Sequence, residues 1–124
     1  MDAILITAFL MLTASDPNFS ESASMFDGNK LHALCVKGRA AQSMAAEKEC
    51  LGYIIGVVDS HMLSSAGLGV PPMVCLPKIV SNDQLLDIVT KDLRDNPSER
   101  HYGASSSVLE SLMRAFPCAA KDAK

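Results

Sequence analysis

The sequence predicts an all-α fold, a compact bundle of about four helices stapled by disulfides. Several segments repeat apolar residues at helical spacing, and four cysteines occur in a chain of 124 residues. Only residues 78–80 carry even a weak strand pattern. A chain of this length is expected to form a single domain.

The first two helices are expected before residue 65. Asp27-Gly28-Asn29 can cap a short helix. Its apolar side carries Leu31, Leu34 and Cys35. Residues Ala40–Ser64 then form the longest helix, which is apolar on most of its circumference and is therefore the central one. Its main apolar face consists of Leu51, Ile54, Ile55, Val58 and Met62.

A long loop separates these helices from two further ones. Residues 64–78 contain three prolines and two glycines, which break regular structure. Ser81, with Gln84 three residues later, is a capping-box signature and opens a helix that ends before Pro97. The last helix starts near residue 103, and its inward positions are Val108, Leu109, Leu112, Met113 and Phe116.

The cysteines favour two disulfides over a zinc site. Zinc ligands come in close pairs such as CxxC, whereas the spacings here are 15, 25 and 43 residues. About 14 helical residues span about 21 Å, so a straight central helix keeps Cys50 too far from Cys75 for a bond. The up-and-down path of the helices then favours the pairs Cys35–Cys50 and Cys75–Cys118.

The chain begins with features of an export signal. Residues 3–12 are a run of ten apolar residues that small residues follow, as in a secretory h-region and cleavage site. Met1-Asp2 carries no basic residue, which leaves a buried first helix as the alternative. A misplaced start codon would explain the missing basic residues. We expect residues 1–15 to be a signal peptide and the mature chain to be periplasmic.

The remaining chain divides simply. Residues 16–25 read as a flexible entry, 26–119 as one helical domain and 120–124 as a short charged tail. The net charge of −3 argues against nucleic-acid binding, which needs basic patches. No apolar run reaches the roughly 18 residues of a membrane span, so no membrane contact is expected once the signal is removed.

No group of residues has the pattern of an active site. The three histidines, His32, His61 and His101, lie far apart and fit no metal-binding motif. No GxSxG or CxxC motif is present. We therefore expect no catalytic activity, no cofactor and no metal. Gly52 and Gly56 form a GxxxG pair, which we expect to allow close approach between packed helices.

The central helix also resembles a known family. Residues 50–59, CLGYIIGVVD, are similar to the C-x-G-Y-I-x-G-V-x-D signature of the Tai-type immunity proteins. The likeness extends in order from Phe26 to Cys118, about three quarters of the chain. Its other pieces are Phe26 with Asp27-Gly28-Asn29, Leu31, Cys35, Cys75-Leu76-Pro77, Gln84-Leu85, Asn96-Pro97, Arg100-His101, Ala104 and Ala115-Phe116-Pro117-Cys118.

The resemblance implies a small, exported, all-helical protein, often dimeric, that binds and inhibits a cognate peptidoglycan amidase effector of a type VI secretion system. Such an inhibitor protects the cell and its siblings, and the family has no catalytic residues to carry over. The alternative is a periplasmic helical stress or chaperone-like binding protein without an effector partner. The Met and Leu residues fall mainly at periodic core positions, which favours the inhibitor.

Two surfaces are candidates for contact with a partner. Loops on a rigid scaffold usually carry such contacts, so we expect them on residues 65–73, at Leu68, Gly69, Val70, Pro71 and Pro72. Residues 94–102 are the other candidate, but Arg100 there is expected to bond a helix-end carbonyl. A family-wide motif is better explained by a shared fold, so a structural role is expected for Gly52, Tyr53, Gly56, Asp59, Pro97, Arg100 and His101.

Overall fold

The computed structural model describes residues 24–119. The expected signal peptide, most of the expected flexible entry and the expected tail at 120–124 lie outside the described residues. In chain order the elements are α2 (Gly28–His32), the π-helical turn η1 (Ala33–Lys37), α3 (Gly38–Ala40), α4 (Met44–Leu68), α5 (Asn82–Asp95), the 3-10 turn η2 (Pro97–Glu99) and α6 (Ala104–Ala115).

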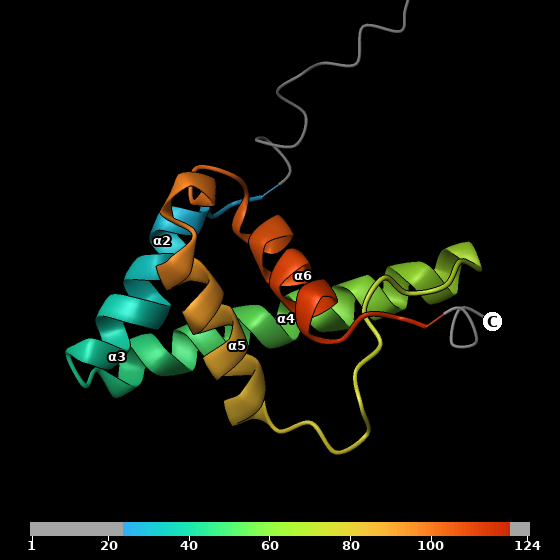
Figure 1. Ribbon diagram of the computed structural model, residues 1–124, viewed down its shortest axis with the longest axis horizontal. Helices are drawn as coiled ribbons and strands as arrows, with labels where there is room; N and C mark the ends of the chain where they lie inside the picture. The colour runs from blue at the N-terminus through green and yellow to red at the C-terminus, as the bar shows by residue number, and fades with distance from the viewer. Residues whose placement is uncertain (1–23, 120–124) are drawn as a thin grey trace, which may run out of the picture.

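The all-α prediction is confirmed. Helix α4 runs along the longest axis of the molecule, and the other elements pack on one part of it (Figure 1). The only β-pairing in the described residues is an isolated antiparallel bridge between Asp27 and Gly103. The weak strand pattern at residues 78–80 was misleading, because the Val80 amide donates to the Pro77 carbonyl and closes a turn.

Three helices begin at side-chain caps. The Asp27 carboxylate accepts from the Lys30 amide at 2.8 Å and caps α2. Ser81 and Gln84 form the expected capping box at the start of α5. Each cap satisfies amide groups that have no partner inside the helix. The expected end of α5 is also confirmed, because the helix stops at Asp95.

The bounds of α4 differ from the sequence prediction at both ends. The helix begins at Met44, because Gln42 has a positive φ of 55° and the Ser43 hydroxyl accepts a hydrogen bond from the Ala46 amide. It continues to Leu68, where Gly69 takes up the left-handed conformation with φ 65°. The chain between Ser64 and Leu68 is therefore helix and not loop. At about 1.5 Å per residue, α4 is roughly 37 Å long.

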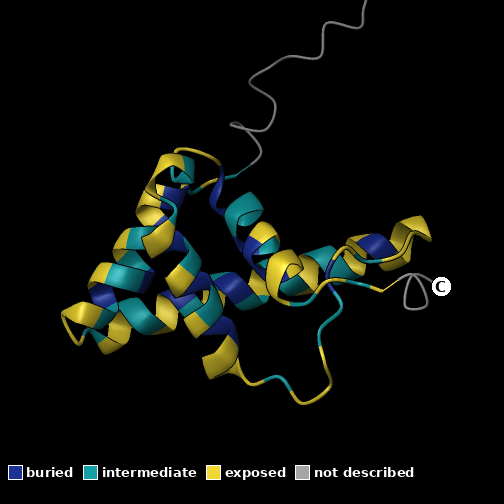
Figure 2. Ribbon diagram, in the orientation of Figure 1, coloured by how far each residue is buried: buried dark blue, intermediate teal, exposed yellow. Residues whose placement is uncertain are grey.

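The core lies between the helices on one part of α4, and Figure 2 shows its buried residues on the facing sides of the elements. Met113 is wrongly predicted as a core residue, because its position on α6 leaves it partly exposed. The buried apolar residues are Leu31, Cys35, Cys50, Ile54, Val74, Leu85, Leu86, Val89, Leu93, Ala104, Val108 and Leu112.

Both predicted disulfides are present. Cys35 pairs with Cys50 across a Cα–Cα distance of 5.2 Å, and Cys75 pairs with Cys118 across 5.1 Å. The first bond lies in the core and joins η1 to α4. The second ties the chain after α4 to the segment after α6. The described residues contain no free cysteine.

Candidate functional site

Exposed apolar side chains gather at the C-terminal end of α4 and in the segment that follows. This end of the helix extends beyond α6 (Figure 1). Leu63 is 75% exposed, Leu68 77%, Val70 50% and Met73 49%. We refer to these four residues as the apolar tip. Leu63 and Leu68 are five residues apart on α4 and so face different directions around the helix end, and Val70 and Met73 follow in the next segment.

The residues expected from the sequence to contact a partner lie in or beside this tip. Leu68 ends α4, Gly69 caps it, and Val70 follows directly. Pro71 is exposed and Pro72 is half-buried. The structure therefore brings the five residues together at one end of the molecule, with Leu68 on a helix where the sequence predicted a loop.

The segment after α4 is fixed at both ends. At its start, the Gly69 amide donates to the Ala66 carbonyl and the Val70 amide donates to the Ser65 carbonyl, which closes the helix end. At its far end, Val74 is buried in the core. Cys75 is held by its disulfide and by a hydrogen bond that its amide donates to the Phe116 carbonyl at 3.1 Å.

His61 holds the middle of the same segment. Its Nε2 atom accepts a hydrogen bond from the Met73 amide at 3.0 Å. An imidazole nitrogen accepts only when it carries no proton, so this contact needs the neutral ring with its hydrogen on Nδ1. No pattern along the chain predicts this contact, because it joins a lone histidine to a backbone amide.

An open groove runs along α4 beside the tip. Its floor consists of small residues four positions apart, and its volume is about 570 Å³. The lining residues are Gly52, Gly56, Ser60 and Ser64, with Tyr53, Val57, His61 and, from α6, Ser105 and Leu109. The groove is thus a shallow, mostly uncharged strip along the longest helix.

This groove corrects the interpretation of the GxxxG pair. Gly52 and Gly56 were expected at a close contact between helices, but a Cβ atom on either would meet no atom within 4 Å. Both glycines are exposed. Helix α6 borders the groove through Ser105 and Leu109 but does not contact the two glycines closely, which leaves them on an open face.

Tyr53 and Asp59 have different surroundings. The Tyr53 ring stacks on Phe26 with centroids 5.2 Å apart. Its hydroxyl lies 3.1 Å from the Ser24 hydroxyl. Tyr53 therefore packs the start of the described chain against α4, while Asp59 is exposed on the helix.

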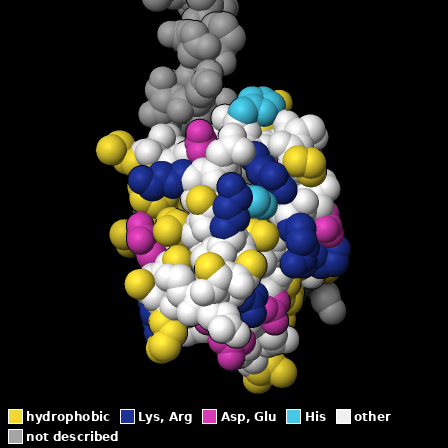
Figure 3. Space-filling model, turned by 90° about the vertical axis from the view of Figure 1, so that its left-hand side faces the viewer, with side chains coloured by type: hydrophobic (Ala, Val, Ile, Leu, Met, Phe, Trp, Pro, Cys, Tyr) yellow, Lys and Arg dark blue, Asp and Glu magenta, His cyan; other side chains and the backbone are white. Residues whose placement is uncertain are grey.

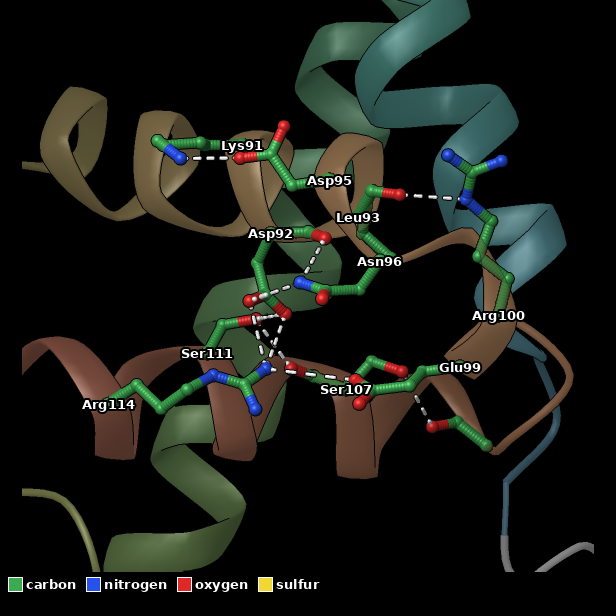
Figure 4. Close-up of polar contacts among 11 residues, drawn as sticks. Lys91, Asp92, Leu93, Asp95, Asn96, Glu99, Arg100, Ser107, Ser111 and Arg114 are labelled. Atoms are coloured by element: carbon green, nitrogen blue, oxygen red, sulfur yellow. Dashed lines mark hydrogen bonds and ion pairs between the residues drawn. The ribbon is translucent and has the colours of Figure 1, made fainter.

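The motif around Pro97 and Arg100 joins α5 to its neighbours. Pro97 occupies the first turn of η2. Arg100 donates through Nε to the Leu93 carbonyl at 2.7 Å (Figure 4). Through Nη2 it also donates to the Arg94 carbonyl at 3.1 Å. Both carbonyls lie in the last turn of α5, where helices have no internal donor left. His101 is exposed beside Tyr102.

A second polar cluster, centred on Asp92, joins α5 to α6. The Asp92 carboxylate accepts hydrogen bonds from the Ser111 hydroxyl at 2.7 Å and from the Arg114 guanidinium at 2.8 Å (Figure 4). Asn96 donates to it as well, at 3.1 Å. Sequence reasoning missed this cluster, because helical spacing identifies Ser111 and Arg114 as neighbours but not the helix they face.

Basic residues are frequent on the side opposite the tip, and one of them, Arg39, is paired with Glu47 and Asp87. The run from Gly28 to Ala40 has three Lys or Arg residues and no Asp or Glu. Figure 3 looks onto this side, where Lys and Arg side chains lie beside a histidine and Asp and Glu side chains lie on the same face. Partial burial, together with the charges of Arg100 and Lys37, holds the pKa of His32 below its usual value. The hydrogen bond from Lys91 lowers the pKa of the exposed Asp95.

Neither a metal site nor a membrane span is found in the described part of the chain. No group of three or more His, Cys, Asp or Glu residues there is arranged to hold a metal ion. No helix in residues 24–119 is both long and apolar enough to cross a bilayer.

Comparison with known proteins gives one match. The sequence model of the Rap1a immunity proteins matches residues 27–118, which include the whole helical bundle, both disulfides and the tip. No curated protein and no solved structure is significantly similar to the chain.

Proposed function

Because the chain belongs to the family of Rap1a immunity proteins, we propose that it binds and inhibits a cognate peptidoglycan amidase delivered by a type VI secretion system. The family supports a role in type VI secretion immunity. The amidase target rests on the Tai-type signature at residues 50–59. In this role the protein protects its own cell and sibling cells from the toxin.

The apolar tip carries the proposal. Leu63, Leu68, Val70 and Met73 are all exposed at this end of the molecule. A partner that covers them removes apolar surface from water, which lowers the free energy of the complex. The tip lies at the C-terminal end of α4, which extends beyond α6 (Figure 1). A projecting apolar surface fits a concave one, and enzyme active sites are concave and mostly apolar.

The backbone of the tip is suited to tight binding. Gly69 is held by its helix-end bonds, and Pro71 and Pro72 have fixed φ angles. Val74 and Cys75 anchor the far end of the segment in the core and by a disulfide. A surface that is already ordered loses less conformational entropy on binding.

The two disulfides support a periplasmic location. Disulfides persist in oxidising compartments such as the periplasm and are rare in the cytosol. Mass spectrometry of the endogenous protein from a periplasmic fraction tests the location and is expected to find a mature chain without residues 1–15. An intact Met1 on a cytosolic species would contradict both expectations.

The binding test needs a candidate partner, and a peptidoglycan amidase encoded next to this chain would be the one to use. Purified wild-type protein is expected to bind the amidase and to block its hydrolysis of peptidoglycan. Leu68→Asp and Val70→Asp place a charge where an apolar contact is expected. Either change is therefore expected to weaken binding by at least about tenfold, as measured by calorimetry or biolayer interferometry.

Ile79→Asp is the matched control. Ile79 is 92% exposed and apolar, but it lies in the turn before α5 and not in the tip. Binding should be unchanged in this variant. If Leu68→Asp and Val70→Asp bind normally while Arg100→Ala abolishes binding without unfolding the protein, the contact surface lies at residues 94–102. Absence of any binding by the wild type would reject the amidase as the partner.

We also propose that the chain forms a homodimer through the groove on α4. The exposed Gly52 and Gly56 allow a second helix to approach closely, and Val57 and Leu109 supply apolar area beside them. Sedimentation equilibrium of the wild type is expected to give twice the monomer mass. Gly56→Leu fills the groove and should give a monomer, whereas Gly67→Leu, outside the groove, should not.

A further inference from the structure

His61 has an unusual position in the sequence and in the structure. Between residues 60 and 77 it is the only His, Asp, Glu, Lys or Arg residue, and the one cysteine there, Cys75, is in a disulfide. Its Nε2 accepts the Met73 amide hydrogen at 3.0 Å. Pro71 and Pro72 have no amide hydrogen. Met73 therefore supplies the only backbone donor within residues 71–73.

We propose that His61 is a pH-dependent latch, which holds the middle of the segment 70–74 against α4 when its ring is neutral and releases it when the ring is protonated. A protonated imidazole has a hydrogen on both nitrogens and no lone pair left to accept one. The Met73 amide and a protonated ring would then present two donors to each other. The contact cannot survive protonation.

The surroundings of His61 offer no charged group to replace this contact. The residues that line the groove with it carry no charge near neutral pH: Gly52, Tyr53, Gly56, Val57, Ser60 and Ser64 from α4, and Ser105 and Leu109 from α6. The nearest charged residues along the three elements are Asp59 on α4, Lys78 on the segment and Glu110 on α6. In the described residues, none of these three forms an ion pair with His61.

Release is confined to the middle of the segment. The bond from the Val70 amide to the Ser65 carbonyl contains no titratable group, and Cys75 is held by its disulfide. Opening the latch therefore loosens Met73, one of the four residues of the tip. The consequence for partner binding rests on the proposed function, whereas the latch is a property of the free chain.

Hydrogen exchange of the free protein tests the latch. We expect the protection of the Met73 amide, measured by NMR and corrected for the intrinsic effect of pH, to fall about fivefold between pH 7.5 and pH 5.0. The Val70 amide, bonded to a backbone carbonyl, is the internal control and should keep its protection. His61→Phe removes the acceptor and should leave Met73 unprotected at both pH values.

Two further variants complete the test. The side-chain oxygen of His61→Gln can accept the Met73 hydrogen but does not titrate, so protection should no longer change with pH. His101→Gln removes an unrelated histidine and should keep the wild-type profile. The latch is rejected if Met73 exchanges equally in wild type and His61→Phe at pH 7.5, or if wild-type protection is the same at both pH values. Loss of amidase binding with an intact exchange profile counts only against the proposed function.

Discussion

A Cβ atom on Gly28 would lie 2.7 Å from the carbonyl oxygen of Arg100. The two backbones touch because the Gly28 amide donates to the Tyr102 carbonyl and the Asn29 amide donates to the Arg100 carbonyl, both at 2.9 Å. The start of α2 is therefore docked on the chain between α5 and α6. The same Arg100 holds the end of α5 through its side chain, so this one residue joins α2 to α5.

Gly28→Ala is expected to lower the free energy of unfolding by about 1–3 kcal/mol, because the backbone must move to admit the methyl group. Gly67→Ala is the matched control. It lies in α4 with no atom within 4 Å of the added carbon, and should stabilise the protein by about 0.5–1 kcal/mol. Urea unfolding followed by circular dichroism measures both. Equal effects of the two changes would argue against the close contact.

Asp92→Ala is expected to destabilise the protein by roughly 1–3 kcal/mol, because Ser111, Arg114 and Asn96 lose an acceptor in a partly buried place. Asp95→Ala, in the same helix, removes only exposed ion pairs, those with Lys91 and Arg94, and should change stability little. Chemical unfolding of the two variants provides the comparison. A larger loss in Asp95→Ala would mean that the Asp92 cluster does not hold α5 to α6.

Because folding lowers the pKa of His32, the free energy of unfolding is expected to fall in acid. Partial burial and the charges of Arg100 and Lys37 lower this pKa in the folded protein. The unfolded chain therefore binds the proton more readily than the folded chain. The contribution of His32 to the free energy of unfolding is complete above the pKa of the unfolded chain, near pH 6.5. It is lost as the pH falls through the lower pKa of the folded protein.

The measurement compares the free energy of unfolding at pH 7.5 and pH 5.0. His32→Gln should lose less stability over this interval than the wild type, because its side chain does not titrate. His101→Gln should lose as much as the wild type. An equal loss in His32→Gln and wild type would show that His32 does not contribute to the pH dependence.

Loss of the Cys75–Cys118 bond is expected to reduce stability by about 4 kcal/mol, from the entropy of a loop of 43 residues. The corresponding figure for Cys35–Cys50, with 15 residues, is about 3 kcal/mol, and substitution there also removes two sulfur atoms from the core. Double alanine variants measure both effects. Limited proteolysis should then cut within residues 69–76 only in the Cys75→Ala/Cys118→Ala variant, since that bond anchors this segment.

The sequence predicted the helices and the disulfides well, because both depend on patterns along the chain. The Ser81–Gln84 box, the stop at Pro97 and the cysteine spacings are local signals. The start of α4 was misplaced by the helix-favouring residues 40–43, because nothing nearby shows that Gln42 turns into the left-handed region. The end of α4 was misplaced because Gly67 is an ordinary helical residue and Gly69 is the cap.

The site was less accessible to sequence reasoning. The segment 65–73 was identified by its glycines and prolines, but its projection from the bundle depends on how far α4 extends. The GxxxG pair shows the same limit, since small residues permit a close contact without saying whether a helix lies there. The bond from Met73 to His61 depends on the return path of the chain, which no pattern at either residue reveals.

The projection of the α4 end also has an evolutionary consequence. Leu63, Leu68, Val70 and Met73 take little part in the core, so replacing them changes folding stability little, as for most exposed positions. A lineage that meets a new toxin can therefore vary these positions without weakening the bundle. Residues that fix the scaffold, such as Gly28, have no such freedom. Divergence among relatives is expected to concentrate at this end of the molecule.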